Sequence, residues 1–374
     1  MNLSFNIIIS GGGTGGHIYP AISIAQSIQE INPHTNILFV GAHGRMEMKK
    51  VPYAGFQIQG INMMGLQRKI TLKNFLLPYY ILKSIQQVKQ IFQVFKPDAV
   101  IGTGGYVSFP VVYTAQIKHI PNYIQEQNAF AGLANKILAK RSNKIFVAFD
   151  KMEKFFPKEK IIVSGNPVRQ DLHNIQEKKQ YAHPHFHMHT HHPVVLILGG
   201  SLGAQRINET IAQNIDFFIQ NNIQLIWQMG THFYANISNE LKTQLQKYSV
   251  YYKDFIYEMD LAYAASDVII SRAGASTIAE LALVEKPVIL IPSPHVTNNH
   301  QMKNALALSE KNAALLIPDH QVPTQLIPAL QKIIKDKELQ QTLSANIKKW
   351  AKPHAAKTIA QYILNDLYKI YSHP

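Results

Sequence analysis

Short apolar runs alternate with longer amphipathic stretches along both halves of the chain. In the first half, the apolar runs predict strands at Phe5–Ser10, Asn36–Gly41, Ala99–Thr103, Asn122–Gln125 and Lys144–Ala148. In the second half, they predict strands at Val194–Leu198, Leu225–Met229, Val268–Ser271 and Val288–Ile291. These runs lack polar alternation, which is typical of parallel strands covered by helices on both faces. Helical stretches such as Ala21–Glu30 and Leu82–Phe95 separate them, so the order predicts a doubly wound α/β fold.

The chain is long enough for two domains of this kind. It has 374 residues, whereas one domain usually has about 100–200. The change of domain is expected near Gly165–Asp171, which gives a first domain over 1–165 and a second over 166–352. We expect the last residues, 353–374, to form a helix that packs back on the first domain.

Composition narrows the possible chemistry. Lys and Arg outnumber Asp and Glu by 37 to 23, and the resulting charge of +14 favours an anionic partner: nucleic acid, an acidic membrane surface or a phosphorylated ligand. The absence of cysteine excludes a disulfide scaffold, a thiolate metal site and a cysteine nucleophile. The sequence contains neither a signal-peptide pattern nor a run of about 20 apolar residues, so a cytoplasmic protein is expected, free or bound to a membrane surface.

Glycine-rich segments follow three predicted strands, at residues 11–16, 102–105 and 199–203. Glycine lets a ligand approach the backbone, and a helix N-terminus attracts anions through its unpaired N–H groups. Ligands of open α/β sheets bind at the carboxyl ends of the strands, so these segments predict a ligand held between the domains. A dinucleotide site would also need an acidic residue after the second strand, but the chain reads Gly41-Ala42-His43-Gly44 and has no carboxylate before Glu47.

A further strand-to-helix turn spans residues 271–280. Ser276 and Thr277 begin the helix, where hydroxyls and backbone amides can bind a diphosphate. Glu280 follows at a spacing that lets a carboxylate accept hydrogen bonds from both hydroxyls of a ribose. An ordinary helix carboxylate is the alternative for Glu280.

Six motifs occur in order along the chain: GGGTGGHIYPA, GTGGYVSFP, QEQNAFAGLANK, GNPVR, GGSLGAQRIN and SRAGASTIAELALVEKPVILIPSP. From Gly11 to about Ala305 they resemble the bacterial peptidoglycan glycosyltransferase family that makes lipid II, the undecaprenyl-diphospho-muramoylpentapeptide β-N-acetylglucosaminyltransferases. The resemblance implies a GT-B fold, with two Rossmann-like domains facing across a cleft. It also implies inverting transfer of N-acetylglucosamine from UDP-N-acetylglucosamine to the 4-hydroxyl of the N-acetylmuramoyl unit of lipid I. No metal and no cofactor are implied.

The resemblance also implies roles for individual residues. His17 matches a position proposed as the general base, and a role in ordering the loop is its alternative. Glu126 is the second candidate for the base. Substrate-binding positions are implied at Thr14, Gly15, Gly16, Asn128, Arg169, Ser201, Ile256, Ala275, Ser276, Thr277, Glu280 and Gln301. Two features depart from the family pattern: His300, where many members have glutamine, and the histidine-rich segment His183–His192, which we expect to be a surface loop that either binds a metal or is a neutral insertion.

The stretch between Met48 and Pro97 contains eight Lys or Arg and no Asp or Glu. Its segment 72–82 is apolar on nearly every side. Basic residues beside such a segment fit docking of residues 66–83 on an anionic bilayer, and two packed helices with a coincidental basic bias are the alternative. We therefore expect a peripheral protein on the cytoplasmic face of the inner membrane, and nucleic acid becomes the least expected partner.

Two other functions remain open from the sequence. A UDP-N-acetylglucosamine 2-epimerase shares the GT-B architecture, but it needs carboxylates around the sugar, whereas the loops of the first domain are nearly free of acidic residues. A UDP-sugar-binding module without catalytic activity is the third possibility.

Overall fold

The computed structural model describes residues 3–63, 77–168, 172, 175–200, 203–248, 250–296 and 299–372. The chain divides into two compact units, 1–169 with 352–374, and 170–351. The expectations for Arg169, for Ser201 and for residues 66–76 lie outside the described residues. None of the helices in the described ranges has both the length and the apolar content to cross a membrane.

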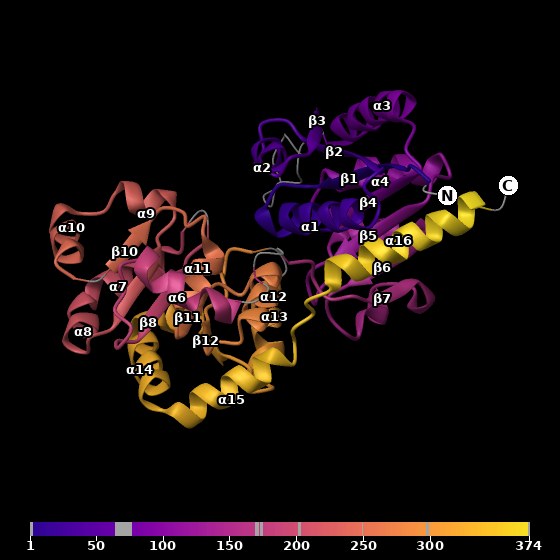
Figure 1. Ribbon diagram of the computed structural model, residues 1–374. Helices are drawn as coiled ribbons and strands as arrows, with labels where there is room; N and C mark the ends of the chain where they lie inside the picture. The colour runs from indigo at the N-terminus through magenta and orange to yellow at the C-terminus, as the bar shows by residue number, and fades with distance from the viewer. Residues whose placement is uncertain are drawn as a thin grey trace. The chain divides into compact units, whose positions relative to one another are not determined.

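The first unit is a parallel sheet with helices on both faces (Figure 1). Its described strands are β1 (Asn6–Gly11), β2 (Asn36–Ala42), β3 (Gln57–Ile61), β4 (Ala99–Gly104), β5 (Asn122–Glu126), β6 (Lys144–Val147) and β7 (Ile161–Val163). Its helices are α1 (Gly15–Ile31), α2 (Glu47–Tyr53), α3 (Leu77–Phe95), α4 (Ser108–Ile117), α5 (Leu133–Leu138) and α16 (Ala355–Ser372). The strand order is β3-β2-β1-β4-β5-β6-β7. Strands β2 and β3 thus lie on one side of β1 and the later strands on the other, so the order of the strands reverses between β1 and β4. Ligands of doubly wound sheets bind at such a switch point, outside the carboxyl ends of the strands.

The last helix, α16, belongs to the first unit. It lies alongside α1 (Figure 1), and Ile359, Ile363 and Leu367 enter the same apolar cluster as the strand residue Ile7. Tyr123 of β5 donates a hydrogen bond to Asp366 Oδ2 of this helix at 2.5 Å. Burial and the Asp366 carboxylate raise the pKa of the Tyr123 hydroxyl, which therefore keeps the proton that it donates.

The second unit repeats the plan. Its described strands are β8 (Val194–Leu198), β9 (Gln224–Gln228), β10 (Val250–Lys253), β11 (Val268–Ser271), β12 (Val288–Leu290) and β13 (Leu315–Leu316), in the order β10-β9-β8-β11-β12-β13. Its helices are α6 (Ile175–His185), α7 (Gln205–Gln213), α8 (Ile215–Gln220), α9 (Thr231–Ala235), α10 (Asn239–Gln246), α11 (Met259–Ala265), α12 (Ala275–Val284), α13 (His300–Ser309), α14 (Val322–Lys335) and α15 (Lys337–Lys348). The switch point lies between β8 and β11, both of which begin and end in buried residues.

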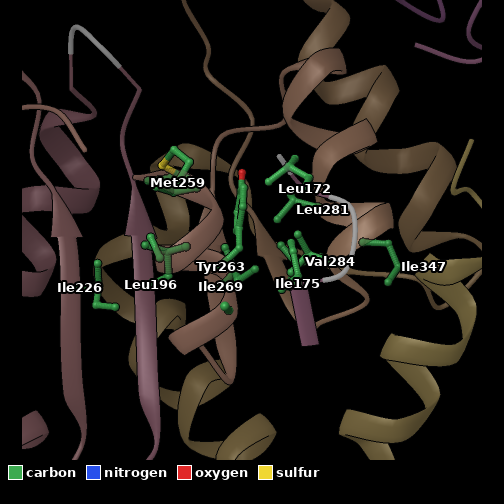
Figure 2. Close-up of a cluster of buried hydrophobic side chains, with 14 of the residues drawn as sticks. Leu172, Ile175, Leu196, Ile226, Met259, Tyr263, Ile269, Leu281, Val284 and Ile347 are labelled. Atoms are coloured by element: carbon green, nitrogen blue, oxygen red, sulfur yellow. The ribbon is translucent and has the colours of Figure 1, made fainter. Parts of the chain in front are cut away.

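One face of this sheet is covered by α11 and α12. Figure 2 shows Leu196 and Ile269 of the strands packed with Tyr263 of α11 and Leu281 of α12. The Tyr263 ring is buried within this cluster, and its hydroxyl reaches a side chain of α12. The packing of the Tyr263 ring in this apolar cluster therefore determines where its hydroxyl oxygen lies.

The sequence patterns missed the strands at the sheet edges and the true start of α1. Strand β3 alternates exposed and half-buried residues, and β13 has two residues, so neither forms the continuous apolar run of a central strand. Helix α1 begins at Gly15 rather than near Ala21, where the expected helical stretch begins, because the Thr14 carbonyl already accepts hydrogen bonds from the N–H groups of His17 and Ile18. His17 therefore lies in the first helical turn.

The histidine-rich segment is anchored at its start, so the expectation of a surface loop is corrected there, while His185, His187, His189 and His191 are exposed as expected. Its first residues end α6, and the buried His183 has its Nε2 atom 3.2 Å from the Ala265 carbonyl oxygen. Phe186 and Met188, which alternate with the histidines, are buried in the core of the second unit. Among the residues that the structure describes, no group of three or more His, Asp or Glu side chains is arranged to hold a metal ion.

Candidate active site

Two glycine loops meet at the switch point of the first unit. The Gly12 N–H donates to the Gly104 carbonyl oxygen at 3.4 Å. Gly105 has a φ of +80°, and a Cβ atom there would lie 2.3 Å from the Gly12 carbonyl oxygen. Only a residue without a side chain allows this approach, which explains the glycine at this position.

His17 lies over this junction, with its half-buried imidazole held on one side. The Nδ1 atom is 3.1 Å from the Thr103 carbonyl oxygen and 3.1 Å from Gln127 Oε1. The Thr103 hydroxyl donates to the His17 carbonyl oxygen at 2.8 Å. Three residues before His17, the Thr14 side chain is exposed and makes no capping hydrogen bond to α1. The structure thus brings Thr14, Gly15, Gly16 and His17 together at the carboxyl edge of the sheet.

Glu126 ends β5 and is buried, and its oxygens have four hydrogen-bond contacts. Oε1 accepts from the Asn128 N–H at 3.0 Å and from Asn128 Nδ2 at 3.3 Å. Oε2 accepts from the Gly132 N–H and from Asn135 Nδ2, both at 2.9 Å. These contacts fix the loop that carries Asn128, which favours a positioning role for Glu126 over the role of base.

Glu47 is a residue of this site that sequence reasoning missed. Its side chain is fully buried, and its two oxygens accept from the Gly13 N–H at 3.0 Å and the Ala42 N–H at 3.1 Å. The carboxylate therefore ties the glycine loop to the end of β2. The sequence does contain a signal for this residue. Glu47 comes shortly after the second predicted strand, and no other Asp or Glu follows it up to Pro97.

The switch point of the second unit is formed by a helix N-terminus. Helix α12 begins directly after the β11 turn, with Gly274 as its N-cap and no acidic residue in its first turn. Ala275, Ser276 and Thr277 form this first turn. Their backbone amides and the positive end of the helix dipole lie at the carboxyl edge of the sheet, where an anion would be stabilised.

Polar side chains are oriented around this helix by neighbouring groups. The Tyr263 hydroxyl donates to Glu280 Oε2 at 3.0 Å. Arg272, at the end of β11, binds Asp319 Oδ1 through Nη1 at 2.6 Å and the Ile291 carbonyl oxygen at 3.2 Å. The roles of Tyr263 and Arg272 were not expected from the sequence. Each residue orients another side chain through a hydrogen bond, and such a contact leaves no sequence motif.

Two more expected residues lie in the second unit, Gln301 in a helix and Ile256 on a loop. The Gln301 side chain, in the first turn of α13, accepts from the Ser293 N–H at 2.8 Å through Oε1. The Ile256 side chain is buried, and its N–H donates to Gln228 Oε1 at 3.1 Å. Both residues are therefore held in place by amide hydrogen bonds.

A cavity of about 580 Å³ in the second unit lies away from these residues. It is lined by His191, Asp267 and Lys286 among others, near the amino ends of β8, β11 and β12. Burial, together with the Lys179 charge, lowers the pKa of Lys286. Since ligands of such sheets bind at the carboxyl ends, this cavity is not the candidate active site.

Comparison with known proteins identifies both halves of the chain. Residues 7–147 match the glycosyltransferase family 28 N-terminal domain, and residues 194–359 match the glycosyltransferase family 28 C-terminal domain. Together with the two Rossmann-like units, these matches define a glycosyltransferase.

Curated relatives define the family more narrowly. The chain is 48% identical to the UDP-N-acetylglucosamine--N-acetylmuramyl-(pentapeptide) pyrophosphoryl-undecaprenol N-acetylglucosamine transferase of Flavobacterium psychrophilum, over 96% of this chain and 97% of that protein. It is 46% identical to the protein of the same name from Parabacteroides distasonis, over 98% and 99% of the two chains. The chain belongs to this family of N-acetylglucosamine transferases, which confirms the resemblance predicted from the six motifs.

Solved structures support the fold class. The crystal structure of Acinetobacter baumannii MurG matches with a TM-score of 0.75 and 24% identity, over 96% of this chain and 99% of that chain. A UDP-GlcNAc 2-epimerase from Neisseria meningitidis matches with a TM-score of 0.68 and 16% identity, over 97% and 100%. At such identities the likeness shows the fold alone, so the predicted GT-B class is confirmed and the function rests on the closer relatives.

Proposed function

We propose that the chain transfers N-acetylglucosamine from UDP-N-acetylglucosamine to the 4-hydroxyl of the N-acetylmuramoyl unit of undecaprenyl-diphospho-muramoylpentapeptide, lipid I, to form lipid II. Relatives named for this activity, at 48% and 46% identity over nearly the full chain, support the reaction. The observation that carries the proposal is the pair of switch points. One presents an imidazole, and the other presents the N-terminus of α12 with Glu280 beside it.

In this proposal the second unit binds the donor. The first turn of α12 binds the diphosphate through its amides and through Ser276 and Thr277. Glu280 accepts hydrogen bonds from the ribose hydroxyls. The Ile256 carbonyl group reads the uracil edge, since its N–H is bonded to Gln228. Gln301 contacts the donor sugar through its amide nitrogen, because its oxygen is bonded to Ser293.

Two of the expected donor contacts, Arg169 and Ser201, are retained as part of the proposal. Both lie outside the described residues, so their assignment depends on the motifs GNPVR and GGSLGAQRIN. In the first unit, Thr14, Gly15, Gly16 and Asn128 are proposed to bind the donor sugar.

The chemical step is a single displacement. The acceptor oxygen forms a bond to the anomeric carbon while the bond from that carbon to the β-phosphate oxygen breaks. The imidazole of His17 takes the acceptor proton, and the electron pair of the broken bond leaves with UDP. The N-terminus of α12 stabilises the charge that develops on the diphosphate. The configuration at the anomeric carbon is thereby inverted.

We further propose that residues 66–83 dock on an anionic membrane surface at the cytoplasmic face of the inner membrane. In the described part of this region, Tyr79 is 58% exposed and Leu82 is 69% exposed. Lys83 Nζ lies 5.9 Å from the centre of the Tyr79 ring, which places a cation beside exposed apolar surface. Flotation with vesicles tests this proposal: binding to anionic vesicles should exceed binding to neutral ones, and equal binding to both would contradict it.

The function is tested with radiolabelled UDP-N-acetylglucosamine and a lipid I analogue. We expect a labelled lipid product that a β-specific N-acetylglucosaminidase cleaves. Formation of UDP-N-acetylmannosamine would indicate the epimerase instead. Binding of UDP without transfer of the sugar to the lipid would indicate a binding module and would contradict the proposal.

A further inference from the structure

The protonation pattern of the His17 ring follows from the atoms around Nδ1. A backbone carbonyl oxygen can only accept a hydrogen bond, and the Thr103 carbonyl oxygen lies 3.1 Å from Nδ1. The hydrogen must therefore be on Nδ1 when the ring is neutral. Within the described residues, Nε2 of His17 has no hydrogen-bond partner, so its lone pair is left to receive a proton.

The second oxygen at Nδ1 belongs to Gln127, and its orientation is determined by other amides. Gln127 Nε2 donates to the Thr103 carbonyl oxygen and to Gln125 Oε1. Gln125 Nε2 donates to Asn166 Oδ1 at 2.9 Å, and Asn166 Nδ2 donates to the Gln127 carbonyl oxygen at 3.0 Å. A rotated Gln127 amide would place its oxygen against two acceptors, so this network keeps Gln127 Oε1 facing the ring.

We propose that Gln127 is a positioning residue that, with the Thr103 carbonyl group, holds His17 in the Nδ1–H tautomer and leaves Nε2 to take the acceptor proton. This inference rests on the proposed function, in which His17 is the base. Gln127 is 2% exposed, and its amide contacts the ring nitrogen opposite the one that would react.

The same contacts serve the step after proton transfer. An imidazolium carries hydrogens on both nitrogens, and the Nδ1–H then faces two oxygen dipoles in a half-buried environment. Both oxygens stabilise the developing positive charge. An amide is uncharged, so it orients the ring without adding a fixed negative charge beside it. Loss of Gln127 should therefore lower turnover and leave donor binding intact.

The test uses the full-length protein with ¹⁵N-labelled histidine side chains. Long-range ¹H–¹⁵N spectra distinguish the Nδ1–H from the Nε2–H tautomer, and the His17 signal is identified by its loss in His17→Gln. We expect the Nδ1–H tautomer in the unmodified protein. In Gln127→Met, which keeps the length of the side chain, we expect a mixture of tautomers. We also expect a kcat lower by about 10- to 100-fold, the range seen when a metal-ligating histidine loses the partner that orients it, and a KM for UDP-N-acetylglucosamine within twofold.

The matched control is Gln116→Leu. Gln116 is another buried amide of the same unit, and its Nε2 donates to Asn122 Oδ1, the Leu138 carbonyl oxygen and Ser142 Oγ, with no contact to His17. It should reduce stability while kcat and the His17 tautomer stay unchanged.

Three outcomes would overturn the inference. They are an Nε2–H tautomer in the unmodified protein, an unchanged tautomer and kcat in Gln127→Met, or an equal loss of kcat in Gln116→Leu. The first outcome is measured on the unmodified protein, so it does not depend on whether a variant folds. If the base assignment itself is wrong, His17→Gln keeps its turnover while the tautomer result is unaffected, so the two failures can be told apart.

Discussion

The two units place different chemistry at the same point of the same topology. In the first unit, the loops after β1 and β4 contact each other closely, and a Cβ on Gly105 would meet backbone at 2.3 Å. In the second unit, a Cβ on Gly203 would lie 2.6 Å from the Met229 carbonyl oxygen, whereas a Cβ on Gly200 would have no atom of the described residues within 4 Å. The first switch point presents an imidazole held between two loops, whereas the second presents the N-terminus of α12.

This difference shows what the fold supplies and what the side chains supply. A parallel sheet with a switch point provides an edge where loops converge and a helix begins. In the first unit, Glu47 and Thr103 hold those loops rigidly around a titratable ring. In the second unit, α12 begins with small residues that leave its amides close to the edge. One edge is thus suited to moving a proton, and the other to holding an anion.

The largest effect is expected for a variant of His17, which should affect proton transfer and leave the binding of UDP unchanged. The variant His17→Ala removes the proposed base, and kcat should fall by about 10²- to 10⁴-fold, the usual contribution of general base catalysis. The affinity for UDP, measured by calorimetry, should stay within twofold, because in the proposed function the second unit binds UDP. His34→Ala, at an exposed position of the same unit, is the control and should have no effect. Retained turnover in His17→Ala would assign this ring to loop ordering only.

Much of the fold around the two switch points could be predicted from the sequence. The central strands and the glycine-rich turns are visible because buried parallel strands form continuous apolar runs. Strand β3 was missed because an edge strand is exposed along part of its length. The motifs give His17 and Glu280 as candidates, whereas Glu47, Gln127 and Tyr263 are recognised only from their contacts with residues elsewhere in the chain. A single sequence does not reveal such contacts.

The next effect is on donor affinity. The variant Glu280→Ala removes the carboxylate that is proposed to accept hydrogen bonds from the ribose hydroxyls. Hydrogen bonds to charged groups contribute about 1.5–3 kcal/mol, or roughly 10- to 150-fold in the dissociation constant of UDP. Turnover at saturating donor should change little, in contrast to His17→Ala. Glu285→Gln is the matched control, because Glu285 follows the same helix and forms an exposed ion pair with Lys348 at 3.0 Å. A large loss of kcat with unchanged UDP affinity would contradict the division of roles.

The smallest effect concerns how Glu280 is held. Tyr263→Phe keeps the buried ring and removes the hydroxyl that donates to Glu280 Oε2 at 3.0 Å. The hydroxyl affects the donor only indirectly, by orienting Glu280, so its loss should cost less than Glu280→Ala, about 0.5–1.5 kcal/mol. UDP binding should therefore weaken by roughly 2- to 12-fold, with kcat unchanged. If the hydroxyl acts through Glu280, Tyr263→Phe should have no further effect in the Glu280→Ala background. Additive losses in the double variant would mean that Tyr263 affects the donor by another route. Non-additive losses would mean that Tyr263 positions Glu280 in the second unit, as Gln127 is proposed to position His17 in the first.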